Sequence, residues 1–287
     1  MISKFNLEVK AMGFWLYLIK LLQTGFVSAP TPYGLFHIIS LILTITFTAM
    51  VCVYHRKDSP DKVRKTVLWV SLAVVGLEIL KQILFTVNFS ESGEPSFSYA
   101  WYAFPFQFCS TPMYVGVLQG IIKKGKIHDS LCAYLATYAV FAGLCVMLYP
   151  GDVFMSMIFI CVQTMFCHGS MIPVGAYLMS TGHVKTEHKT IFKAMCTFGV
   201  AVVVAILLNE LVYASGILGG ETFNMFFISR YFPSTLPVYS SIHNSVPYPL
   251  NVIIYFAGFS LAAYIILLIA MGIKKIAKRL SKEKVEN

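Results

Sequence analysis

Long apolar runs constrain the fold of this chain more than any other feature. Of its 287 residues, 57% are hydrophobic and only 12% are charged, about half the charge of an ordinary soluble domain. A run of about 20 apolar residues can cross a ~30 Å hydrocarbon core as a helix. The chain holds seven such runs: 33–54, 67–89, 101–122, 129–149, 153–179, 190–215 and 248–273. We therefore predict an all-α polytopic membrane protein with seven transmembrane helices.

The distribution of basic residues predicts the orientation. The net charge is +9, and lysine and arginine gather in connections 55–66, 123–128 and 180–189 and in the tail, whereas 90–100 and 150–152 contain none. Basic residues mark the cytoplasmic side, so we predict the N-terminus outside and the C-terminus inside. We attribute the basic excess to topology and to attraction for anionic lipid, and we expect no nucleic-acid partner. A bacterial plasma membrane is the expected location.

The chain is predicted to have three parts: an N-terminal segment 1–32, a single seven-helix domain 33–273 and a basic cytoplasmic tail 274–287. Within the first part, helical spacing gathers four apolar residues on about one face: Phe14, Trp15, Leu18 and Leu22. This predicts an amphipathic helix in the outer interface. A signal peptide cleaved before Pro30 and an eighth span are the alternatives. The sequence does not indicate an oligomeric state.

The cysteines exclude one kind of site and favour another. All seven lie inside predicted spans and none forms a CxxC pair, so we predict no disulfide framework, no metal site and no cofactor. Most are expected to be small core hydrophobes. Cys109 differs because Pro105 and Pro112 flank it and remove backbone donors. Transmembrane helices that are loosened in this way often build a site.

Ionisable and amide groups inside the spans are costly and therefore mark functional positions. At ~1.5 Å of rise per residue, most of them fall in the outer half of the membrane, where they can converge on one cavity; they include His37, Glu78, Lys81, Gln107, His168 and Asn209. Structural alternatives remain open. Glu78 and Lys81, spaced i, i+3, can neutralise one another, His37 can be a wetted interfacial anchor, and His168 can be a satisfied core histidine.

Five short motifs follow one another along the chain: LFHIISL around His37, FPFQFC ending at Cys109, YPG at 149–151, HGSM at His168, and Asn209 followed by TFNMFFIS around Asn224. In their order and spacing they resemble the YwaF-like integral membrane proteins of bacteria. Through them, the chain resembles the eukaryotic transmembrane acyltransferase family that makes polyunsaturated ether phospholipids. Gln107 stands where many members carry histidine, so any catalytic role of that position is altered or lost here.

The resemblance implies a phospholipid acyltransferase, or transacylase, with Cys109 as nucleophile and His168 as base. A thioester on the cysteine would carry a fatty acyl chain from a donor phospholipid to a lysophospholipid, and these membrane lipids are the expected partners. Supporting roles fall to two groups: the oxyanion donors Gln107, Asn209 and Asn224, and the charged or phosphate-binding groups His37, Glu78 and Lys81. A transporter or a receptor-like binding protein using the intramembrane Glu, Lys and His groups is the alternative function.

Overall fold

The protein is described by a computed structural model covering residues 13–286 apart from 27, 152 and 244. Within this part of the chain, six helices are long and apolar enough to cross a membrane. They are α3 (Leu35–Tyr54), α4 (Pro60–Thr86), the pair α6 (Lys126–Ala136) and α7 (Tyr138–Leu148), α8 (Ile158–Ser180), α9 (Lys189–Ala214), and the stretch Tyr248–Leu280 of α11 (Tyr248–Glu286). The prediction of an all-α polytopic membrane fold is confirmed.

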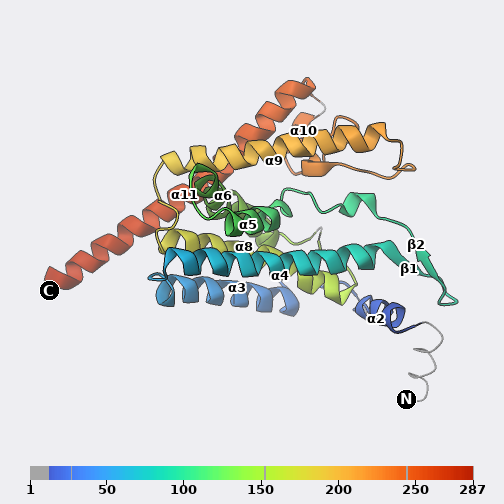
Figure 1. The fold of residues 1–287 in the computed structure, drawn as a ribbon, viewed down its shortest axis with the longest axis horizontal. Helices are drawn as coiled ribbons and strands as arrows, with labels where there is room; N and C mark the ends of the chain where they lie inside the picture. The colour runs from blue at the N-terminus through green and yellow to red at the C-terminus, as the bar shows by residue number, and fades with distance from the viewer. Residues whose placement is uncertain (1–12, 27, 152, 244, 287) are drawn as a thin grey trace, which may run out of the picture.

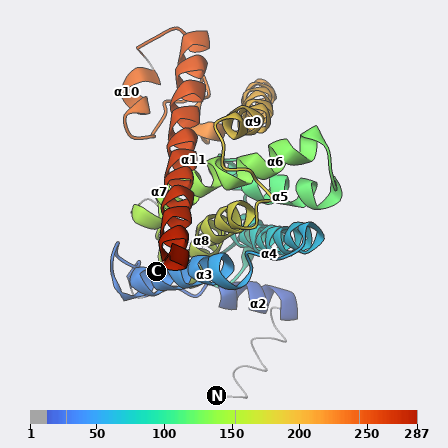
Figure 2. The same ribbon diagram turned by 90° about the vertical axis from the view of Figure 1, so that its left-hand side faces the viewer.

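The helices form a bundle that α11 crosses obliquely (Figures 1 and 2). Helix α8 packs against α3 on one side and α7 on the other, α4 packs against α5, and α6 packs against α9. Aromatic rings from α6, α7, α9 and α11 stack in the centre of the largest core cluster, namely Tyr134, Tyr138, Phe198 and Tyr255. Many large apolar side chains on α3, α9 and α11 are exposed, as expected for surfaces that face lipid.

The predicted span 101–122 is not a continuous helix. It consists of the short 3-10 helix η1 (Trp101–Ala103), an irregular stretch 104–110 and the 11-residue helix α5 (Thr111–Ile121). Apolar length alone predicted a complete helix. Pro105 lies in the irregular stretch, and Pro112 occupies the first turn of α5, where a missing backbone donor is tolerated. The two prolines therefore delimit an unwound segment and not merely a loosened one.

The broken segment nevertheless runs along most of α4. Gln82 Nε2 donates a hydrogen bond of 2.8 Å to the Ala103 carbonyl at one end. The Arg64 guanidinium donates to the Gly120 carbonyl at the other end. Gln82 and Arg64 lie about 27 Å apart along α4 at the usual helical rise. The segment therefore extends over roughly the thickness of a hydrocarbon core, although only half of it is helical.

The connections divide between the two ends of the bundle. Connections 55–59, 122–125 and 181–188 lie at the left of Figure 1, together with the late part of α11; α2 (Phe14–Leu22) and the hairpin of β1 (Val87–Phe89) with β2 (Pro95–Phe97) lie at the right. At the left end, Asp58 binds Lys62 and the Tyr177 hydroxyl. Hydrogen bonds from the Lys62 ammonium and then from Tyr177 lower the pKa of Asp58 to about 2. The division matches the predicted grouping of basic connections, whereas the orientation in a membrane stays a prediction.

The structure describes helices at both ends of the chain. Helix α2 has nine residues, too few to cross a bilayer, and Phe14 and Trp15 on it are exposed; the rest of the predicted segment, up to residue 12, lies outside the described residues. At the other end, α11 continues as far as Glu286. The predicted boundary between domain and tail at 273/274 is therefore not a break in the helix, because Lys, Arg and Ala are good helix formers.

A close contact between α7 and α8 depends on Gly143. A Cβ atom at this position would lie 2.6 Å from the His168 carbonyl oxygen and 3.0 Å from the Met171 Cβ. Small residues let two helices approach closely, and a larger residue at such a position forces the helices apart and weakens their packing. The contact also sets the depth at which α8 presents His168.

We expect Gly143→Ala to lower the free energy of unfolding by about 1–3 kcal/mol through overpacking. The matched control is Gly272→Ala, since no atom lies within 4 Å of a Cβ built there and alanine favours a helix. Thermal unfolding in detergent micelles measures both. Equal melting temperatures for the two variants would contradict the close contact.

Candidate functional site

Cys109 lies in a turn immediately before α5, half-buried. The Gln107 carbonyl accepts hydrogen bonds from Ser110 N at 2.9 Å and from Thr111 N at 3.2 Å, which closes this turn. Among the described residues, no carbonyl accepts a hydrogen bond from the Cys109 backbone N–H. The sulfur thus sits at the N-terminal end of a helix, where the aligned peptide dipoles favour negative charge.

Side chains replace the missing helical hydrogen bonds of the unwound stretch 104–110. The Tyr114 hydroxyl donates to the Pro105 carbonyl at 2.8 Å, and Thr111 Oγ1 donates to the Phe108 carbonyl at 2.8 Å. Irregular backbone at membrane depth is tolerated only when protein groups satisfy it in this way. Specific hydrogen bonds within the protein therefore hold the turn that carries Cys109 in place.

A buried polar network lies on α4 and α8, centred on Glu78. Its carboxylate accepts from Lys81 Nζ at 2.8 Å, Gln82 Nε2 at 2.8 Å and Gln163 Nε2 at 3.1 Å. Gln163 Nε2 also approaches Cys167 Sγ at 3.3 Å. The ion pair between Glu78 and Lys81 exists, so the alternative of mutual neutralisation is realised. It is not an isolated pair, because the two amides extend it towards α8.

Helix α4, which carries Glu78 and Lys81, packs against α8, which carries His168, and against α5, which begins just after the turn of Cys109. The structure therefore brings four of the predicted site residues to one region between α4, α5 and α8. Cys109 Sγ and the His168 ring share no hydrogen bond in the part of the chain that the structure describes. The predicted nucleophile and the predicted base are therefore not hydrogen-bonded to one another among the described residues.

His168 is buried, and its two ring nitrogens differ. Nδ1 lies 2.8 Å from the Thr164 carbonyl, one turn earlier on α8. A carbonyl can only accept, so Nδ1 carries the proton and Nε2 carries the lone pair. Nε2 is buried and has no partner among the described residues. The alternative of a core histidine with both nitrogens satisfied is therefore not what the structure holds.

The amides of Gln107 and Asn209 both bind the short 3-10 helix η2 (Met225–Phe227). Gln107 accepts from Phe226 N at 2.9 Å. Asn209 accepts from Met225 N at 2.8 Å and donates to the Met225 carbonyl at 3.0 Å. Phe226 has φ of 59°, and Phe227 of 58°, a left-handed conformation that costs of order 1–3 kcal/mol per residue. The amides hold this strained loop in place.

Asn224 belongs to the same group. Its Nδ2 donates to the Phe232 and Pro233 carbonyls at 3.3 Å and 3.1 Å, and its carbonyl accepts from Gln107 Nε2 at 3.0 Å. Both amide hydrogens of Asn224 are engaged, so this arrangement leaves none for an oxyanion. Gln107, Asn209 and Asn224 meet as a scaffold beside the Cys109 turn.

His37 lies apart from this region. It is fully buried, accepts from Tyr33 N at Nδ1 over 2.8 Å and lies 2.9 Å from the Met147 carbonyl through Nε2. Both ring nitrogens are therefore used in joining the start of α3 to the end of α7. No nitrogen of this ring remains to bind a lipid phosphate, and His37 is not the wetted anchor considered above.

Two apolar hollows flank the region. One, of about 490 Å³, lies between α4 and the broken segment and is lined by Glu78, Gln82, Pro105, Met113 and Tyr114 among others. The second, of about 520 Å³, lies between α3, α4 and α8 and reaches Gly169, the neighbour of His168. Both are mostly hydrocarbon-lined, as a site for an acyl chain would be.

The structure also groups residues that the sequence analysis did not select. His128, Cys132 and His183 place their ligand atoms within 4.8 Å of one another, although no metal site was predicted. The search for CxxC pairs missed them because the set contains one cysteine. The available signal was the spacing of His128 and Cys132, since residues four apart share a helix face.

We expect Glu78→Gln to destabilise the protein by about 3–5 kcal/mol, because it leaves the largely covered Lys81 ammonium, whose side chain is 17% exposed, without its counterion. The double variant Glu78→Gln/Lys81→Met should recover most of that loss. Thermal unfolding in micelles measures both, with Glu94→Gln on the exposed hairpin as control. If the double variant is no more stable than the single one, the pair is not an interdependent unit.

Comparisons with known proteins complete the description of the site. Searches of curated proteins and of solved structures find no match. A family model matches residues 32–273, from just before α3 into α11 and including every predicted site residue. The match agrees with the eukaryotic side of the resemblance noted above, whereas the bacterial side stays a prediction. The chain belongs to the TMEM164 family, and this membership is consistent with a membrane acyltransferase.

Proposed function

We propose that the chain is a membrane-embedded phospholipid transacylase that holds the acyl chain as a thioester on Cys109. The observation that carries the proposal is the position of Cys109 in the turn just before the half-helix α5, which packs against the helix α4 that carries Lys81. A helix N-terminus favours the thiolate. Family membership supports the acyltransferase class.

In the first step, the Cys109 thiolate attacks the ester carbonyl of a donor phospholipid. The carbon–sulfur bond forms, the ester carbon–oxygen bond breaks, and the leaving alkoxide takes up the proton that the thiol gave up. The products are an acyl-cysteine and a lysophospholipid. The transient oxyanion would be stabilised by the free N–H of Cys109 and by the α5 dipole. Gln107, Asn209 and Asn224 would support this step by holding the neighbouring loop.

In the second step, a lysophospholipid hydroxyl attacks the thioester. His168 Nε2, which has a lone pair and no partner among the described residues, takes the hydroxyl proton as the oxygen–carbon bond forms. The carbon–sulfur bond then breaks, and the proton held by His168 passes to the departing sulfur, which restores the thiol and the neutral imidazole. His168 makes no hydrogen bond to Cys109 among the described residues. We therefore assign it to removing the proton of the lysophospholipid hydroxyl and not to activating the thiol. The bound lipid would fill the gap between them.

The apolar hollow between α4 and the broken segment supports an acyl chain as the transferred group. Glu78 and Gln82 form its polar part, and Pro105 places its wall next to the Cys109 turn. The transporter alternative has less support, because Glu78 is paired with Lys81 and Glu210 is paired with Arg230 near the surface. Charges that neutralise one another pairwise do not outline a pathway for an ion.

We expect intact-protein mass spectrometry of the wild type, after incubation in phospholipid bilayers, to show a fatty-acyl adduct that hydroxylamine removes. Cys109→Ala should abolish the adduct because it removes the sulfur. Cys145→Ala on α7 and Cys167→Ala next to the Glu78 network are the controls and should retain it. Absence of an adduct on folded wild-type protein would overturn the thioester and favour a non-catalytic function.

We expect His168→Gln to form the adduct but to discharge it to added lysophospholipid about 10²–10⁴-fold more slowly, because the general base is lost. A preformed acyl-enzyme chased with lysophospholipid, followed by mass spectrometry over time, measures the discharge. His188→Gln, whose exposed ring contacts Tyr264, should discharge at the wild-type rate. Unchanged discharge in His168→Gln would remove this histidine from the second step. Loss of adduct formation instead would move its role to the thiol.

A further inference from the structure

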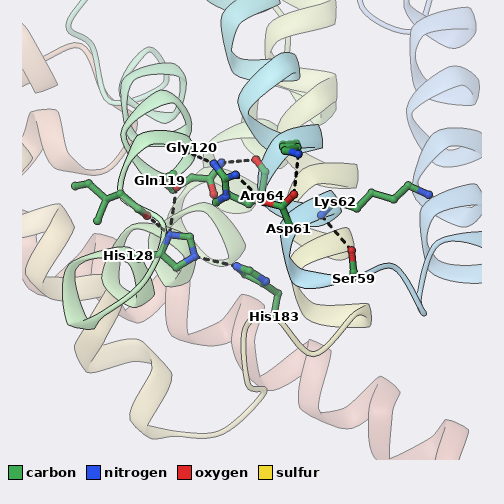
Figure 3. A network of polar contacts seen from close by, with 10 residues as sticks. Ser59, Asp61, Lys62, Arg64, Gln119, Gly120, His128 and His183 are labelled. Carbon is green, nitrogen blue, oxygen red and sulfur yellow. Dashed lines mark hydrogen bonds and ion pairs between the residues drawn. The ribbon is translucent and has the colours of Figure 1, made fainter.

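A cluster of three ligand-type side chains lies at the end of the bundle that holds the basic connections. His128 and Cys132 occupy successive turns of α6, and His183 lies in the connection between α8 and α9. Figure 3 shows the His128 and His183 rings pointing toward one another. The side chains of His128 and Cys132 are buried, with 5% and 1% of their surface exposed. His128 contacts the C-terminal end of α5 through the Gln119 and Ile122 carbonyls, whereas Cys109 precedes the N-terminal end of that helix, so the cluster is distinct from the site described above.

The distances within the cluster match those around a tetrahedral metal ion. His128 Nε2 lies 3.0 Å from His183 Nε2 and 3.5 Å from Cys132 Sγ. Bond lengths of about 2.05 Å to nitrogen and about 2.3 Å to sulfur place two nitrogens of a tetrahedral zinc about 3.4 Å apart, and a nitrogen and a sulfur about 3.6 Å apart. The two pairs that include His128 therefore need only a few tenths of an ångström of adjustment, whereas Cys132 Sγ and the His183 ring, which lie within 4.8 Å of one another, can need an approach of up to about 1.2 Å.

The surrounding backbone prepares the first histidine for this role. His128 Nδ1 lies 2.6 Å from the Ile122 carbonyl and 3.2 Å from the Gln119 carbonyl. Both are acceptors, so Nδ1 carries the proton and Nε2 presents its lone pair to the cluster. Metal-binding histidines characteristically donate their other N–H to a carbonyl or carboxylate, which fixes the ring and raises its basicity. The end of α5 supplies that partner here.

We propose that His128 Nε2, Cys132 Sγ and His183 Nε2 bind a zinc ion. A set of two imidazoles and one thiolate suits this borderline-soft cation. Cys132 releases its proton to solvent when the zinc–sulfur bond forms, and no electron is transferred. The three residues leave a fourth position, which water can fill from the side of the half-buried His183. The bound ion would clamp connection 181–188 to the α5–α6 corner and so fix the relative positions of α8 and α9.

The competing arrangement is a hydrogen bond between the two histidines, with Cys132 as a neutral thiol beside them. It uses the same geometry without a metal, since His183 Nε2–H can donate to the His128 lone pair. The two differ in one measurable respect. A metal site contains a thiolate, and its contribution to stability disappears when the metal is removed.

The test is a cobalt titration of the full-length protein, purified in detergent, stripped with a chelator and then dialysed. We expect saturation at about one ion per chain, as for a single tetrahedral site, with a thiolate-to-cobalt charge-transfer band that zinc abolishes by displacement. Cys132→Ser should lose the band and bind zinc at least tenfold more weakly, on the order of a ligand's contribution. The controls Cys196→Ser and His188→Asn, outside the cluster, should behave as the wild type.

Thermal unfolding provides a second readout that does not depend on the variant folding well. A chelator should lower the melting temperature of the wild type and added zinc should restore it, whereas neither should change that of Cys132→Ser. Absence of the charge-transfer band in the wild type would overturn the proposal and leave the histidine hydrogen bond. The same conclusion follows if Cys132→Ser and the wild type bind zinc equally.

Discussion

The structure depends on satisfying the backbone of one unwound stretch, 104–110, inside a bundle of membrane-spanning helices. Hydrocarbon supplies no hydrogen bonds, so each polar group freed by the break needs a protein partner. Tyr114 and Thr111 provide partners from α5, and Gln82 on α4 binds the Ala103 carbonyl just before the stretch. Gln107 then binds the strained loop η2 through both ends of its amide. The break, its supporting side chains and the second loop therefore form one interdependent unit, and Cys109 is part of it.

This unit explains why polar residues of different kinds gather near the sulfur but serve different purposes. The amides Gln107, Asn209 and Asn224 are occupied by backbone groups and maintain shape. The ion pair of Glu78 and Lys81 is embedded in further hydrogen bonds and supplies charge. His168 keeps one nitrogen without a partner in the described part of the chain, the property that a proton acceptor needs. Burial strengthens the polar interactions that these groups make, because electrostatic interactions are stronger where water is excluded.

Much of the fold could be predicted from hydropathy, since helices α3, α4, α8, α9 and α11 fall on the apolar runs at 33–54, 67–89, 153–179, 190–215 and 248–273. The prediction failed at 101–122, where length suggested a whole helix and the prolines decided otherwise. It also failed to detect His128, Cys132 and His183, because His183 joins the other two only when α8 and α9 are packed against α6. The spacing of residues along α6 does not reveal that His183, in the connection between α8 and α9, lies beside that helix.

The sequence by itself determined that this protein lies in a lipid bilayer and how many long apolar segments it has. It also determined which end of the bundle collects basic residues and which types of reactive side chain the interior contains. Those properties follow from composition and from the transfer energy of side chains between water and lipid. Tertiary structure alone decided which nitrogen of His168 is free, that His37 is fully used in joining two helices, and that Glu78 reaches α8 through Gln163. Such assignments depend on contacts between segments distant in the chain, and only packing creates them.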